Sequence, residues 1–251
     1  MKQVEHAAGR ASGVVFRHGM SEKRARGEQI ALGANALFNP HILLRSGLAH
    51  PRLGAGLHEQ VSLSVTVDLG GVDNFQGSTS LTGHGYMLYD GPHRARHAAC
   101  LMETSNQPKL RMERGRWRHR LAMKFLFEDL PRETNRVTAE GPHSDLPTVR
   151  WQGHSDYAQR GMDVLERTLE DVLAPLPVER VVSRVAQPTE GHILGTTVMG
   201  NDPGASIVDR NLVHHRLRNL LVLGGSTFPT SSPANPTLTI AALSLWAASR
   251  A

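Results

Sequence analysis

His192 is the residue in this chain best suited to move a proton. It lies in the stretch Gly-His-Ile-Leu-Gly-Thr-Thr-Val-Met-Gly at 191–200. An unperturbed imidazole has a pKa of about 6.5, so histidine exchanges protons near neutral pH and suits a general base. The chain holds 14 histidines, most of which we expect to be structural. The neighbouring Gly195-Thr196-Thr197 turn and Met199-Gly200 set His192 apart from them.

A second polar group, Asn235, precedes Pro236 and Thr237 at the start of the last apolar stretch. Asn is favoured at the N-cap and Pro at the first helical position, which predicts a helix over 237–248. Its free N–H groups and positive dipole end favour negative charge. By itself, Asn-Pro would more simply be an ordinary helix start. Here it follows Phe-Pro-Thr at 228–230 and a strand-like run at 220–223 that ends in Gly-Gly-Ser.

These residues together closely resemble the C-terminal signature of the glucose-methanol-choline (GMC) flavoprotein oxidoreductases. The resemblance is carried by 30–47, about 126–157 and 190–248. It implies an FAD-dependent oxidoreductase acting on the CH–OH groups of an alcohol, sugar or polyol. His192 would remove the hydroxyl proton as hydride passes to flavin N5, and the Asn235 amide would hydrogen-bond the substrate oxygen. Val198 departs from the family pattern, because relatives often carry arginine there.

The resemblance also implies which residues contact FAD. A turn over the nucleotide half would be formed by Gly33, Ala34 and Asn35. The strand end near the ribityl-diphosphate would supply Gly224, Gly225 and Ser226, with a hydrogen bond donated by Ser226; the alternative for these three is a plain tight turn. The helix start would stabilise the negative charge of the reduced flavin through Asn235, Pro236 and Thr237. Asn rather than His at 235 resembles the sugar and polyol dehydrogenase branch.

The elements that would position these residues are α/β plus α+β in class. The alternation of 61–69 predicts a half-buried strand of an antiparallel sheet with one wet face. Helical spacing over 155–173 and a shorter stretch at 40–46 predict two further helices. We expect a partial FAD/NAD(P)-binding-like domain at 1–60 and an inserted substrate-binding domain, sheet plus helix, at 61–185. A C-terminal GMC segment at 186–251 would complete the FAD-binding and catalytic domain.

No G-x-G-x-x-G fingerprint occurs in the sequence, although this loop normally grips the diphosphate of a dinucleotide. Two alternatives follow. In the first, the chain is the catalytic, substrate-binding half of a dehydrogenase that is incomplete without an N-terminal half: it would be a fragment, or would be completed by a separate FAD-binding N-terminal chain. Its expected partners would be that chain or an electron-acceptor subunit. Otherwise it is a catalytically silent truncated GMC protein that acts at most as an interaction module. In both cases we expect the isolated chain to bind FAD weakly or not at all.

Composition excludes several other classes. The net charge of +5 comes without a zinc-finger spacing, an RNA-binding aromatic motif or a helix-turn-helix pattern, so we expect no nucleic-acid partner. The sequence shows no metal-binding motif, and its single cysteine allows no intrachain disulfide. No apolar run reaches the length of a membrane span and no export signal appears, so a cytoplasmic location is expected by default.

Overall fold

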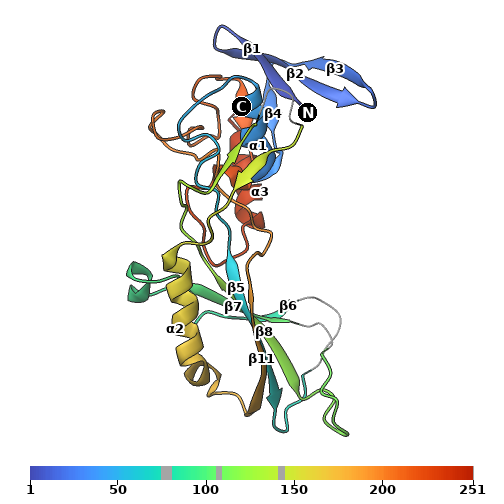
Figure 1. Cartoon of the computed structure of the whole chain (residues 1–251), viewed down its shortest axis with the longest axis vertical. Helices are drawn as coiled ribbons and strands as arrows, with labels where there is room; N and C mark the ends of the chain where they lie inside the picture. The colour runs from blue at the N-terminus through green and yellow to red at the C-terminus, as the bar shows by residue number, and fades with distance from the viewer. Residues whose placement is uncertain (75–80, 106–108, 141–144, 251) are drawn as a thin grey trace.

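A five-stranded antiparallel sheet forms the lower body of the molecule in Figure 1. The computed structural model describes residues 1–74, 81–105, 109–140 and 145–250. The strand order is β11 (Val178–Gln187), β5 (Val61–Leu69), β8 (Arg120–Phe127), β7 (Cys100–Ser105) and β6 (Leu81–Gly85). A short 3₁₀ turn, Pro92–Ala95, precedes β7. The antiparallel sheet within a mixed α/β fold confirms the predicted class.

Helix α2 (Asp156–Leu173) covers one face of this sheet, as Figure 1 shows. Ser155 caps the helix by accepting a hydrogen bond from the backbone N–H of Ala158. The helix buries one apolar stripe, and the odd-numbered residues of β5 pack in the same core. That shared core contains Val61, Leu63, Val65, Val67, Leu165 and Leu169. The periodicity of each sequence segment therefore determines which face of each element is buried.

The opposite face of β5 differs from the prediction of one wet face. Ser62, Thr66 and Asp68 point away from α2, yet all three are buried. Asp68 is paired with Arg120 on β8 and with Arg180 on β11, while Ser62 donates a hydrogen bond to Glu190. Polar partners from neighbouring strands and from the segment after β11 cover this face. A covered polar face and a solvent-exposed one give the same alternation of polar and apolar residues, so the sequence could not distinguish them.

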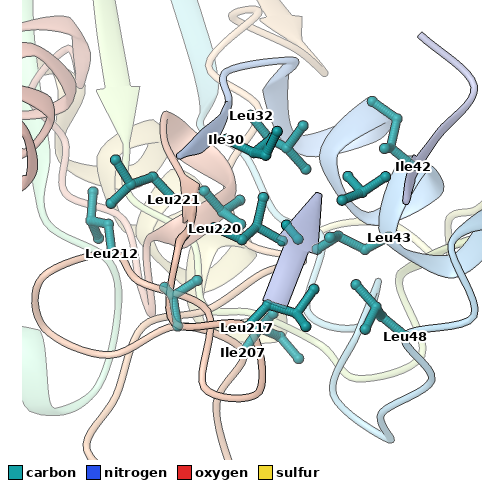
Figure 2. Packing of buried hydrophobic residues seen from close by; sticks show 14 of the residues in the cluster. Ile30, Leu32, Ile42, Leu43, Leu48, Ile207, Leu212, Leu217, Leu220 and Leu221 are labelled. Carbon is teal, nitrogen blue, oxygen red and sulfur yellow. The ribbon is translucent and has the colours of Figure 1, made fainter. Parts of the chain in front are cut away.

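The upper body contains the termini and two short sheets (Figure 1). Strands β1 (Gln3–Ala7), β2 (Arg10–His18) and β3 (Ser21–Arg26) form an antiparallel sheet, while β4 (Ile30–Leu32) pairs in parallel with β12 (Leu220–Val222). Helices α1 (Asn35–Arg45) and α3 (Thr237–Ala248) and the 3₁₀ turn Gly225–Thr227 complete this body. Figure 2 shows its apolar core, which joins β4 and α1 to the C-terminal segment through Ile30, Leu32, Ile42, Leu43, Leu220 and Leu221.

Helix α1 begins earlier than the predicted stretch at 40–46. The Asn35 Oδ1 accepts hydrogen bonds from the backbone N–H groups of Leu37 and Phe38, which stabilises the first turn. Pro40 lies inside the helix and cannot donate to the carbonyl of Ala36. The Thr196 hydroxyl donates to that carbonyl instead, at 2.8 Å. A distant loop thus supplies the hydrogen bond that proline removes.

Segments of the chain cross between the two bodies more than once. Strands β9 (Arg136–Thr138) and β10 (Thr148–Arg150) form a separate antiparallel pair, and Val137 packs with Ala36 and Leu57 of the upper body. The predicted boundaries 1–60, 61–185 and 186–251 stay a prediction, with β9 of the middle range packed against the first. In the described part of the chain, no helix has both the length and the apolar character needed to cross a membrane.

Candidate active site

His192 lies half-buried in the loop that follows β11. Its Nδ1 is 2.6 Å from Oε1 of Gln60, the residue immediately before β5. Burial lowers the pKa of His192 below the usual value of 6.5, although the nearby carboxylates of Glu190 and Glu103 act in the opposite direction. The ring is therefore neutral near pH 7, which is the form that can accept a proton.

Gln60 also reaches the loop before α3. Its Nε2 donates to the backbone carbonyls of Ser232 and Ala234, at 2.6 and 3.0 Å. Ala234 directly precedes Asn235, so a single buried amide joins the loop of His192 to the loop of Asn235. The structure thus links the two predicted catalytic residues through Gln60.

The Asn235 side chain is exposed and donates from Nδ2 to Oε1 of Glu103, at 3.0 Å. Its predicted role as the helix cap is wrong: α3 begins at Thr237, Pro236 occupies the cap position, and no side chain caps this helix. The bond to Glu103 uses the Nδ2 group, and among the described residues no backbone N–H of the helix start donates to the Asn235 Oδ1. The backbone N–H groups of the first turn are left without a side-chain acceptor.

Three charged side chains, Glu103, Lys124 and Glu190, lie near His192 and Asn235. Register pairs Glu103 on β7 with Lys124 on β8, and Lys124 Nζ lies 2.8 Å from Oε2 of Glu190. Glu190 is two residues before His192 and also accepts a hydrogen bond from Ser62. The polar face of the sheet therefore carries paired charges directly beside the candidate base.

Gly33, Ala34 and Asn35 line a cavity of about 470 Å³ together with Lys2, Arg17 and Phe38. Gly33 is exposed, and a Cβ built there would meet no atom within 4 Å. The Asn35 side chain is engaged by the N–H groups of α1. The backbone of this turn is therefore open to a bound group, as the predicted close approach requires.

Gly224, Gly225 and Ser226 differ in what they can offer. Gly224 has a φ of +99° with open space at its Cβ position. Gly225 is buried, and a Cβ at this position would lie 2.9 Å from the carbonyl oxygen of Ile193. Ser226 is fully buried, and its hydroxyl accepts a hydrogen bond from Asn39 within the chain. The predicted hydrogen bond from Ser226 to a cofactor would therefore require the surrounding residues to move and expose the hydroxyl.

Asn39 on α1 connects these cofactor segments. Its Oδ1 accepts from the N–H of Ala34 at 2.8 Å, and its Nδ2 donates to the Leu223 carbonyl and to the Ser226 hydroxyl. The backbone of Thr197, five residues after His192, donates to the Ser226 carbonyl at 2.8 Å. The predicted segments at 33–35, 191–197 and 224–226 therefore meet at one place in the upper body.

Sequence reasoning missed Gln60, Glu103, Lys124, Glu190 and Asn39. Signals existed for two of them. Glu190 lies directly before the Gly-His dipeptide, and Gln60 falls on the same face as Ser62 and Ser64 when the alternation of 61–69 is extended by one residue. The other three depend on strand register or on helix docking.

Residues 131–244 match the family model described as GMC oxidoreductase. The 2-methyl-1,2-propanediol dehydrogenase of Mycolicibacterium austroafricanum is 36% identical over 49% of this chain and 24% of the relative. The fructose dehydrogenase large subunit of Gluconobacter japonicus is 28% identical over 86% of this chain and 40% of the relative. The chain therefore spans less than half the length of these curated relatives.

Solved structures share the fold. The crystal structure of pyridoxine 4-oxidase from Mesorbium loti superposes with a TM-score of 0.72 at 19% identity, covering 99% of this chain and 56% of that one. An FAD-dependent oxidoreductase from Chaetomium thermophilum gives a TM-score of 0.73 at 15% identity, covering 98% and 59%. The match at 131–244 confirms the resemblance to the GMC oxidoreductases predicted from the sequence, and the solved structures show that the chain shares the fold.

Proposed function

We propose that this chain forms the substrate side of an FAD-dependent oxidoreductase that acts on CH–OH groups, with His192 as the base. The observation that carries the proposal is the contact between His192 Nδ1 and Gln60, which leaves Nε2 of the ring available, while the same Gln60 amide holds the carbonyl of Ala234, the residue before Asn235. A neutral imidazole held in one orientation is what removal of a hydroxyl proton requires. The alcohol oxygen would lie between this nitrogen and the Asn235 amide.

The residues present fit part of an FAD molecule. Gly33 and Gly224 both have open space where a Cβ would lie, so a flat or phosphate-bearing group can approach the backbone there. The first turn of α3 has N–H groups without a side-chain cap, which favours negative charge. When bound, FAD would supply the two-electron acceptor for oxidation of the alcohol carbon.

The chain's own residues would divide the remaining tasks. His192 Nε2 would take the hydroxyl proton, and the second N–H of the Asn235 amide would hold the substrate oxygen. Glu103 would keep that amide in place by accepting its first N–H. The paired charges of Lys124 and Glu190 give the neighbouring wall a polar character. This polarity supports a sugar or polyol over an apolar alcohol as the substrate class.

An FAD-binding segment, in the same polypeptide or as a separate chain, would complete the site. Helix α3 supports this part of the proposal, because its apolar side chains Leu238, Leu245 and Trp246 are exposed. A contiguous apolar helix face of this kind commonly marks an interface. One relative is the large subunit of a fructose dehydrogenase, which supports the proposal that this protein also assembles with another subunit, such as an electron acceptor. A cytoplasmic location stays a prediction.

The test combines flavin retention with flavin reduction. We expect the purified chain alone to retain little FAD, and a complex with the FAD-binding segment of a relative to retain it. Adding a panel of sugars, polyols and simple alcohols should then bleach the flavin absorbance. His192→Gln should slow bleaching about 10²- to 10⁴-fold without loss of FAD, since general-base catalysis contributes that much. His18→Gln, at an exposed strand end, is the matched control.

Two outcomes would contradict the proposal. Bleaching that is equally fast with His192→Gln would remove His192 from the chemistry. An FAD-loaded complex that no alcohol reduces would instead favour the second candidate, a catalytically silent interaction module, for which the exposed apolar face of α3 is the supporting observation.

A further inference from the structure

Gln60 is almost fully buried at the point where β5 begins, with 1% of its surface exposed. Its side-chain amide makes three short contacts, one with His192 Nδ1 and two with backbone carbonyls of the loop before Asn235. All three contacts connect Gln60 to two loops of the same site. Because the amide is buried, these hydrogen bonds fix its orientation more strongly than they would fix that of an exposed amide.

The chemistry of the partners fixes that orientation. The carbonyls of Ser232 and Ala234 can only accept hydrogen bonds, so the NH₂ group of Gln60 must face them. The amide oxygen then faces His192, and an amide oxygen can only accept. Nδ1 of His192 must therefore carry a hydrogen, and the neutral ring has its lone pair on Nε2.

We propose that Gln60 is a positioning residue that holds His192 as the Nδ1–H tautomer, with Nε2 as the free acceptor, and that it holds the 232–234 loop in register with that ring. The inference rests on the proposed function, since it assigns the nitrogen that would receive the substrate proton. In the opposite tautomer, Nε2 would carry a hydrogen and could not accept one. Gln60 thereby decides which nitrogen acts, without touching the substrate.

The charged groups around the ring do not provide the same control. Glu190 and Glu103 favour the protonated ring, and Lys124 disfavours it. These three groups change how readily His192 is protonated. Hydrogen-bond direction at Nδ1, by contrast, chooses between two neutral forms, and Gln60 provides the hydrogen-bond partner observed at that atom.

Nitrogen NMR of chain labelled with ¹⁵N-histidine tests the inference without FAD or turnover. The His192 signals are identified by their loss in His192→Gln. In the wild type above the His192 pKa we expect a protonated Nδ1 and an unprotonated Nε2. Gln60→Met, which keeps the length but removes the acceptor, should leave a mixture of both tautomers. Gln159→Met on the exposed side of α2 is the control and should leave the His192 signals unchanged.

A second variant covers the case in which Gln60→Met fails to fold. Gln60→Glu keeps an acceptor facing Nδ1 and adds a negative charge, so the Nδ1–H form should persist while the His192 pKa rises by about one unit or more. A wild-type ring protonated on Nε2, or a tautomer that is indifferent to Gln60→Met, would overturn the inference. If the tautomer shifts in Gln60→Met while flavin bleaching in the assembled complex is unchanged, the inference stands and the proposed role of His192 fails.

Discussion

Acid should destabilise this fold through His214, a buried histidine outside the active site. Its Nδ1 accepts hydrogen bonds from the backbone N–H groups of Arg216 and Leu217, at 3.1 and 3.2 Å. Burial, followed by nearby positive charge that includes Arg216, lowers the pKa of His214 from 6.5 to about 4. A protonated ring would turn an N–H against two other N–H groups, so the folded chain resists protonation.

The sign and size follow from the two pKa values. The unfolded chain takes up the His214 proton at higher pH than the folded chain, so stability is full above 6.5 and falls as the pH decreases. The difference in proton binding amounts to about 2 kcal/mol lost at pH 5 and about 3 kcal/mol lost at pH 4. For a fold with a typical stability of about 5–15 kcal/mol this is a large fraction.

Urea denaturation between pH 7 and pH 4 measures this loss against a matched variant. His214→Asn removes the titrating ring but places an amide oxygen at the same number of bonds from the backbone, where it can accept the same two N–H groups. Subtracting the two curves cancels the other titrating groups, His58 and His192 included. The wild type should lose about 3 kcal/mol more than the variant by pH 4. Parallel curves would refute the assignment of a depressed pKa to His214.

Two further substitutions, measured by thermal or urea denaturation, test a close backbone contact and a buried carboxylate. Gly54→Ala should cost at least about 2 kcal/mol, because the new Cβ would lie 2.1 Å from the carbonyl of Val137, whereas Gly153→Ala has a similar positive φ and open space and should cost about 1 kcal/mol. Equal costs would show that the clash relaxes freely. Asp68→Asn should cost about 3 kcal/mol, because it leaves two arginines without their buried carboxylate. Asp145 also pairs with two arginines, Arg17 and Arg45, but its own carboxylate is exposed, so Asp145→Asn should cost less than about 1 kcal/mol. A comparable loss at both sites would contradict the role of carboxylate burial.

Elements with a strong local pattern were predictable from the sequence. The stripe of Ala158, Met162, Leu165 and Leu169 is buried along α2, and α3 spans the predicted 237–248. These segments carry their own periodicity, caps or breakers, so nearby residues decide their structure. Helix α1 was predicted short because Pro40 suggests a helix start. Its first turn is stabilised by Asn35, and the Ala36 carbonyl that Pro40 leaves without a helical partner is bonded by the distant Thr196, which no local pattern contains.

The candidate site also contains some residues that local sequence predicts and others that it does not. His192 and Asn235 could be proposed from their neighbours in sequence, and the family comparison confirms the resemblance on which they rest. The alternation of 61–69 indicates which face Gln60 lies on, but the contacts of Gln60 with His192 and of Glu103 with Asn235 each span 132 positions of sequence and could not be predicted. Strand pairing and loop docking create those contacts, and neither is encoded in a window of adjacent residues.

The hydrogen bond from Thr196 to the Ala36 carbonyl has a consequence for how this sequence can diverge. Any residue other than proline at position 40 would restore an N–H to α1 and satisfy that carbonyl within the helix, which would make the Thr196 hydroxyl redundant. With proline present, losing the hydroxyl at 196 leaves a buried carbonyl without a partner. Positions 40 and 196 should therefore covary among relatives: proline at 40 should be accompanied by a hydroxyl-bearing residue at 196, and the pairing should relax wherever the proline is replaced.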